Sequence, residues 1–186
     1  MASSRASAPG SLRVVERFLN TADLEEVADS IGTPEELAAW MREHRLAGDE
    51  DAFNRVDVQR ARAVRESLRG LTLANNGGQL YPIDLATLNE ALAQARLRTR
   101  FLLDGGVRLE PEATGSVGAL GRILAVVVAA MADGSWRRLK ACRKHSCRYA
   151  FYDHSKNLSG TWCSMAVCGN RVKVSRFRRR QKLSSR

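Results

Sequence analysis

Two residue types are missing from most of this chain, and a third is nearly missing from its end. Residues 1–135 contain neither lysine nor cysteine, and residues 136–186 contain a single acidic residue, Asp153. The first segment has 15 arginines and 19 acidic residues, a net charge of −4, whereas the 15 basic residues of the second give it a net charge of +14. A mildly acidic segment followed by a strongly basic one indicates two parts with different partners.

The sequence also lacks a long hydrophobic run. Its longest apolar stretch, Ile123 to Ala132, is too short to cross a bilayer, which needs about 20 residues. The opening MASSRASAPGS, residues 1–11, is small and polar without the apolar centre of a signal peptide, and we interpret it as a flexible lead-in. We therefore expect a cytoplasmic protein with no membrane partner. In that reducing compartment, cysteines more often hold metal than form disulfides.

Patterns typical of catalysis are missing as well. The sequence shows no paired catalytic carboxylates, no glycine loop that could cradle a phosphate and no nucleophile beside a base. These absences argue against an enzyme. We therefore expect a protein that binds its partners without transforming them.

What the chain does contain predicts a mainly α (α+β) protein. Apolar residues make up 44% of 186 residues, enough for one domain with a core and a small appendage. Apolar spacing predicts a helix from Leu12 to the break NTAD, and another over residues 50–71 with its arginines on the outside. The segment GTPEELAAWM begins a helix, because Thr33 and Glu36 can form a capping box around Pro34.

Three further elements complete a helical N-terminal domain, residues 12–134. Asp84 is expected to cap a helix over residues 85–97. The segment RTRFLLDGGVRLEPE alternates in polarity around DGG, which predicts a small β-hairpin. Ser116 opens a strongly apolar helix that we expect at the centre of the core. The break ADGSW then marks the boundary to a second domain, residues 136–182.

The cysteines all lie in this second domain, at Cys142, Cys147, Cys163 and Cys168. Their pattern is C-x4-C, fifteen residues, then C-x4-C, so each close pair can supply two thiolates from one turn. Zinc favours such a tetrahedral set of thiolates. Because four cysteines leave no open coordination position, we predict one structural Zn²⁺, with His145 and His154 outside the ligand set.

Metal binding is expected to supply folding free energy that this short domain lacks. Four aromatic residues would pack around the metal as a miniature core: Tyr149, Phe151, Tyr152 and Trp162. Cys168 would then anchor a basic helix, CGNRVKVSRFRRRQK, that docks on this core through Val174 and Phe177. The alternative interpretation of the same residues is a solvated run of charge.

Several short motifs resemble those of a known family. The segments WCSMAVCGNRVK and FYDHSKN resemble the CGNR zinc finger, whose motif stands here at Cys168 to Arg171. Residues 12–134 resemble the ABATE domain that precedes this finger in bacterial proteins, through FLNTAD, TPEELAAWM, VRESL and DGGVRLEPE. That family is regarded as stress-related transcriptional regulators whose finger binds DNA. The resemblance therefore implies zinc on the four cysteines and nucleic-acid contact by the basic residues that follow them.

Seven residues are the candidates for DNA contact that this resemblance implies. They are Asn170, Arg171, Lys173, Arg176, Arg178, Arg179 and Arg180. Lysine and arginine neutralise phosphates, whereas Asn170, Arg171 and Arg176 carry the side chains suited to reading base edges. The alternative roles are structural: Asn170 caps the basic helix, and Arg171 braces the zinc loop.

The acidic N-terminal domain is expected to sense a small-molecule effector or to mediate assembly, with the hairpin as one candidate surface for a homodimer. Four residues combine aromatic rings with polar tips and are candidates for lining a ligand pocket: Phe18, Asn20, Thr21 and Trp40. Helix caps and core packing are their alternative roles.

Two other functions stay open for the second domain. One is an RNA- or ribosome-associated protein whose surface aromatic residues stack on bases. The other is a redox sensor that releases zinc when its thiols are oxidised.

Overall fold

The computed structural model describes residues 5–174 and residue 181. Within this part the chain is mainly helical with small strand pairs, which confirms the predicted fold class. The α-helices are α1 (Leu12–Leu19), α2 (Pro34–Glu43), α3 (Arg55–Ala74), α4 (Pro82–Ala95) and α5 (Gly115–Ala132). The strands pair antiparallel, β1 (Ala22–Asp23) with β2 (Ala28–Asp29), β3 (Leu97–Phe101) with β4 (Val107–Pro111), and β5 (Leu139–Ala141) with β6 (Ala150–Tyr152).

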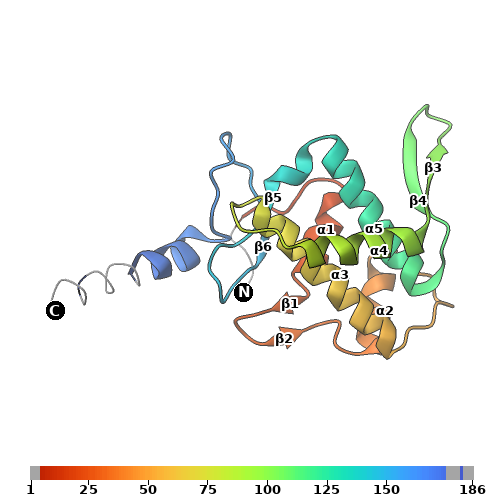
Figure 1. Cartoon of the computed structure of the whole chain (residues 1–186), viewed down its shortest axis with the longest axis horizontal. Coiled ribbons are helices and arrows are strands. Elements are labelled where there is room, and N and C mark those ends of the chain that lie inside the picture. Colours follow the sequence, from red (N-terminus) through yellow and green to blue (C-terminus); the bar gives the residue numbers. More distant parts are fainter. Residues whose placement is uncertain (1–4, 175–180, 182–186) are drawn as a thin grey trace.

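The end of the chain that carries the cysteines forms a C-terminal module, residues 135–174. It begins with the 3-10 helix η1 (Ser135–Arg138), continues through β5 and β6, and ends with the π-helical segment η2 (Met165–Gly169) and helical residues 170–174. In Figure 1 this module and the β3–β4 hairpin lie at opposite ends of the molecule. The helices α1 to α5 lie between them.

Two capping boxes determine where α2 and α3 begin. The hydroxyl of Thr33 accepts a hydrogen bond from the N–H of Glu36 at 3.2 Å, and the Glu36 carboxylate accepts one from the N–H of Thr33 at 3.0 Å, as predicted. Asn54 and Asp57 make the same reciprocal pair. Because this second box fixes the helix start, α3 begins at Arg55 and not near residue 50.

The expected starts of α4 and α5 were wrong. Proline fits the first position of a helix, so α4 begins at Pro82 and Asp84 lies inside the first turn instead of capping it. Ser116 likewise lies inside α5, which begins at Gly115. The Ser116 hydroxyl donates to the carboxylate of Asp57 on α3, so it joins two helices and caps neither.

The helix α5 is central to the core, as predicted. It contacts α1, α3, α4 and β4. Its 18 residues have a mean hydropathy of 1.8, which meets the length and composition of a membrane span, yet half of this stretch is buried within the fold, as in a core helix. The largest fully buried apolar side chains of the core include Phe18, Leu19, Ile31, Leu37, Met41 and Leu68 from elsewhere in the chain and Ile123 from α5 itself.

A close approach of α5 to α4 and β4 depends on Gly121. A Cβ atom at this position would lie 2.8 Å from the Cβ atoms of both Ala95 and Pro111. We therefore expect Gly121→Val to lower the free energy of unfolding by about 1–3 kcal/mol through overpacking. The matched control is Ala129→Val on the exposed side of the same helix. Equal midpoints of urea unfolding for the two variants would show that α4 and β4 can move away from position 121 without a loss of stability.

Two arginines of α3 are buried, whereas the apolar spacing of the sequence predicted them on the outside. Arg65 and Arg69 are only 4% and 5% exposed. Arg65 donates two hydrogen bonds to the carboxylate of Asp29, at 2.8 and 2.9 Å, and Arg69 donates to Glu66 at 2.8 Å. Although burial by itself raises the pKa of Asp29, the bonds from Arg65 lower it below its ordinary value. These partners compensate the buried charge of both guanidinium groups.

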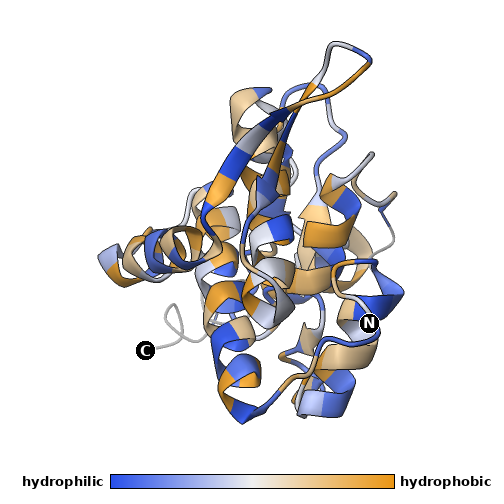
Figure 2. Cartoon of the chain, turned by 90° about the vertical axis from the view of Figure 1, so that its right-hand side faces the viewer, coloured by the Kyte–Doolittle hydropathy of each residue, from blue (hydrophilic) through white to orange (hydrophobic). Residues whose placement is uncertain are grey.

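The β3–β4 hairpin matches its prediction and projects from the helices. Its turn passes through Gly105 with φ of +80°, a conformation that glycine adopts without strain. Figure 2 shows the hairpin standing away from the helices with hydrophobic residues at its tip. Phe101 and Val107 are 81% and 58% exposed there, and Leu103 is fully exposed. The hairpin as a dimer surface stays a prediction.

Candidate metal centre and adjoining pocket

The four cysteine sulfurs lie together in the C-terminal module. All four Sγ atoms are within 4.8 Å of one another, and the Sγ of Cys163 lies 3.7 Å from those of Cys147 and Cys168. Four sulfurs placed tetrahedrally at the usual zinc–sulfur distance of about 2.3 Å are separated by about 3.8 Å. The spacing therefore fits a tetrahedral metal, and four thiolates are a donor set that zinc favours.

Two backbone turns bring the sulfurs to the same point. The first turn follows β5, and the N–H of Cys142 closes it by donating to the carbonyl of Tyr149 at 2.9 Å. The second turn is η2, which Ser164 caps: its hydroxyl accepts from the N–H of Val167 at 3.3 Å, and its carbonyl accepts from the N–H of Cys168 at 2.9 Å. Each turn supplies two of the four sulfurs.

The clustered thiols compete for protons. Hydrogen bonds from Cys147 and Cys163 lower the pKa of the Cys142 thiol. The contact with Cys142 raises the pKa of Cys163, and burial raises the pKa of Cys168. Thiolates at this separation repel one another, so all four ionise together only when a cation offsets their charge. The chemistry of the cluster therefore fits a bound metal.

Aromatic residues pack around the cluster, with one exception. Three of the four expected side chains contact it: Tyr149, Phe151 and Trp162. Tyr152 belongs to the main core instead, because neighbouring residues of a strand point to opposite faces. The two histidines lie outside the sulfur cluster: His145 is exposed, and the Nε2 atom of His154 lies 3.1 Å from the carbonyl oxygen of Ala6.

A buried ion pair stabilises the same module. The ammonium of Lys140 donates to the carboxylate of Asp153 at 2.8 Å and to the carbonyl of Gly160 at 3.2 Å, and Asp153 accepts the N–H of Gly160 at 2.7 Å. Burial by itself raises the pKa of Asp153, but hydrogen bonds from Lys140 and Ser155 hold it well below its ordinary range. The one acidic residue of the basic segment therefore has a structural role.

Side chains of the N-terminal helices hold the backbone of the C-terminal module. The amide of Asn20 both donates to and accepts from the backbone of Ala150, at 3.0 and 2.8 Å. Directly after α3, Asn75 and Asn76 donate four hydrogen bonds of 2.8–2.9 Å to the carbonyls of Trp136, Leu139, Ala141 and Thr161. These contacts fix the metal centre on the ends of α1 and α3.

The candidate DNA contacts lie partly outside the described residues. Asn170, Arg171 and Lys173 are exposed on the helix that follows η2. The structure does not describe the other four candidates or the apolar residue expected to dock beside them: Arg176, Arg178, Arg179, Arg180 and Phe177. Val174 is 48% exposed, so the expectation that it docks on the metal site was wrong. Asn170 lies within the helix, and the cap of η2 is Ser164.

An acidic loop reaches the same surface. The β1–β2 loop carries Glu25, whose carboxylate contacts the ammonium of Lys144 and lies 3.4 Å from the guanidinium of Arg171. Lys144 belongs to the first cysteine turn. Arg171 therefore pairs with an acidic side chain instead of bracing carbonyls of the zinc loop.

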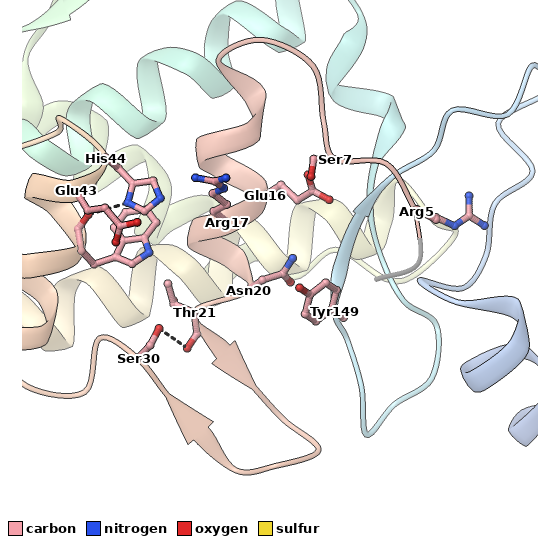
Figure 3. Close-up of a pocket in the computed structure, with 11 residues that line it drawn as sticks. Arg5, Ser7, Glu16, Arg17, Asn20, Thr21, Ser30, Glu43, His44 and Tyr149 are labelled. Atoms are coloured by element: carbon pink, nitrogen blue, oxygen red, sulfur yellow. Dashed lines mark hydrogen bonds between the residues drawn. The ribbon is translucent and has the colours of Figure 1, made fainter. Parts of the chain in front are cut away.

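A pocket of about 490 Å³ adjoins the module, and three of the four residues proposed to bind a ligand line it: Asn20, Thr21 and Trp40. Phe18 is fully buried and packs against Trp40, with ring centroids 5.5 Å apart, so it supports the pocket from behind. Figure 3 shows Glu43 and His44 at one side, Glu16, Arg17 and Asn20 in the middle, and Tyr149 at the other side.

Comparison with known families matches almost the whole described chain. Residues 12–134 match the ABATE family, whose description reads "Putative stress-induced transcription regulator". Residues 138–181 match the CGNR zinc finger. A comparison with curated proteins finds no match.

Proposed function

Because this chain belongs to the ABATE family and ends in a CGNR zinc finger, we propose that it is a zinc-stabilised, DNA-binding transcriptional regulator. One Zn²⁺ would be held by the thiolates of Cys142, Cys147, Cys163 and Cys168. Its role would be structural, because four thiolates complete the tetrahedral shell. The proposal assigns no catalytic step to the protein.

One observation carries the DNA-binding proposal: an exposed basic helix starts at the last cysteine of a closed four-thiol site. The metal would hold the first turn of this helix, so Arg171 and Lys173 keep a fixed direction relative to the module. A fixed array of cations releases counterions from a row of phosphates. If about six cations take part, log–log plots of affinity against salt should have a slope of about −5.

The aromatic residues favour DNA over single-stranded RNA as the partner. Tyr149 and Trp162 pack against the cysteine cluster and are partly buried. Recognition of single-stranded RNA relies on aromatic rings that stand free to stack on bases. The alternative of an RNA- or ribosome-associated protein therefore has less support from this surface.

The proposal is tested by affinity selection of genomic fragments with the zinc-loaded full chain at about 150 mM salt. A variant with Arg171→Gln and Lys173→Gln is selected in parallel, with Arg55→Gln and Arg108→Gln as a matched loss of two exposed cations elsewhere. Enrichment of a shared short sequence by the parent and the control, but not by the first variant, supports the proposal. Recovery without a shared sequence would reduce the basic helix to a general binder of polyanions.

The Glu25 loop yields a further prediction for this function. Glu25 competes with phosphate for Lys144 and Arg171, so Glu25→Gln should raise DNA affinity by about threefold to tenfold at low salt. The neighbouring Glu26→Gln, which removes one charge from an exposed side chain, is the matched control. Fluorescence anisotropy with labelled duplex DNA measures both variants. An equal gain for both would mean that only net charge matters.

A further inference from the structure

The pocket beside the metal centre has the size and position of an effector site. Its volume of about 490 Å³ lies within the range of about 300–1,000 Å³ that is typical for small-molecule sites. Its lining comes from both family regions: α1, α2 and the β1–β2 region on one side, and Tyr149 of the C-terminal module on the other. A ligand here would touch the joint between the two.

Most polar groups of the lining are already satisfied by the protein. The Asn20 amide holds Ala150, the Thr21 hydroxyl donates to the carbonyl of Phe18 at 2.7 Å, and the Glu16 carboxylate accepts the N–H of Ala8 at 2.6 Å. These groups therefore shape the pocket but have little capacity left for a ligand.

Two charged side chains of the lining differ from the rest. Arg17, from α1, and Glu43, from the end of α2, make no ion pair or side-chain hydrogen bond within the part of the chain that the structure describes. They carry opposite charges. A ligand that carried only a carboxylate would pair with Arg17 and leave Glu43 unpaired. A simple amine would do the reverse.

The pocket also has an aromatic wall. The rings of Trp40 and His44 stack with centroids 4.1 Å apart and an interplanar angle of 17°, and the imidazole Nδ1 lies 2.8 Å from the carbonyl oxygen of Trp40. Phe18 packs against the indole from the core, with its ring centroid 5.5 Å from that of Trp40. A flat aromatic surface favours a planar ring as its partner.

We propose that this pocket binds a zwitterionic small molecule with a planar ring, of which an aromatic amino acid is the simplest example. Its carboxylate pairs with Arg17, its ammonium group pairs with Glu43, and its ring lies against Trp40 and His44. Only a ligand with both charges leaves neither side chain unpaired. The inference deepens the proposed regulatory function: it rests on the expectation that the N-terminal domain senses a small-molecule effector, and it names the class of that effector.

The test is isothermal titration of the zinc-loaded full chain with three probes that share one ring. L-phenylalanine carries both charges, 3-phenylpropionate lacks the ammonium group, and phenethylamine lacks the carboxylate. We expect L-phenylalanine to bind at least about tenfold more tightly than either of the others, which corresponds to one charge-assisted contact. Equal affinities for L-phenylalanine and 3-phenylpropionate would overturn the zwitterion assignment, as would the absence of binding by all three.

Two variants assign the charges. Arg17→Gln should weaken the binding of L-phenylalanine and 3-phenylpropionate but not that of phenethylamine. Glu43→Gln should weaken the binding of L-phenylalanine and phenethylamine but not that of 3-phenylpropionate. Arg108→Gln, on the exposed hairpin, is the control and should change none of them. If both variants lost affinity for all three probes to the same extent, the assignment of the carboxylate to Arg17 and of the ammonium group to Glu43 would be contradicted. DNA binding of the same proteins without ligand is measured separately, so a failed ligand class and a failed DNA-binding function give different results.

Discussion

Replacing Cys163 with serine is expected to lower the zinc affinity of the full chain by more than about 100-fold. Loss of a residue that only hydrogen-bonds to a metal ligand costs about 10–100-fold in affinity, and loss of a ligand should cost more. Cys163 lies 3.7 Å from two other sulfurs, so its removal leaves three thiolates and a poorly matched hydroxyl around the metal. Structural zinc contributes about 10–16 kcal/mol to folding in small zinc-binding peptides. Loss of this contribution should therefore open the cysteine turns and the helix after η2.

Competition with a chromophoric chelator measures the affinity, and hydrogen exchange locates the opening. The matched control is Ala166→Ser, which adds a hydroxyl at an exposed position of the same turn. Protection of backbone amides from hydrogen exchange should fall in the cysteine turns of the Cys163 variant. It should persist in α5 of both variants. Unchanged zinc affinity in the Cys163 variant would mean that this thiol is not a ligand.

Replacing Asp153 with asparagine is expected to destabilise the zinc-loaded protein by about 3–5 kcal/mol. Asp153 is fully buried and Lys140 is 4% exposed, so the substitution leaves a buried ammonium group with only carbonyl partners. Because the pKa of Asp153 lies below its ordinary value, the pair contributes its full stabilisation above about pH 4. This contribution is lost as the pH falls through the lowered pKa of the folded state.

Denaturant unfolding at saturating zinc measures this effect without a change in metal occupancy. Lys140→Met combined with Asp153→Asn should be less destabilised than Asp153→Asn alone, because no unpaired charge then stays buried. Lys156→Met, at an exposed position, serves as the control and should shift stability by less than about 0.5 kcal/mol. A loss below about 1 kcal/mol for Asp153→Asn would show that water reaches Lys140 and compensates for the charge.

Features that depend on neighbours in sequence could be predicted here. The capping box of Thr33 and Glu36 spans three positions, and the hairpin turn follows from glycine at Gly105. The pairing of Cys142 with Cys147 in one turn was visible from their spacing, because a metal constrains which spacings can occur. In each case the local chain geometry restricts the outcome.

Features that depend on distant partners could not be predicted. Asn76 lies in a segment typical of a loop, yet its amide binds the carbonyl of Thr161, 85 residues away in the sequence. Arg65 and Arg69 occupy the buried side of α3, together with Val58, Ala61 and Thr72. Their spacing of four residues was the available signal. Charge alone placed them outside, because the distant acceptors, the carboxylate of Asp29 and the carbonyl of Leu19, were not known to face them.

The joint between the two family regions has an asymmetric chemistry. In the hydrogen bonds made by Asn20, Asn75 and Asn76, the helical side supplies amide side chains, whereas the finger supplies only backbone atoms. Every residue has the same backbone acceptors, so substitutions in the finger leave these bonds intact as long as the chain follows the same path. The finger can therefore diverge in sequence without losing these hydrogen bonds, whereas evolution is expected to retain Asn20, Asn75 and Asn76.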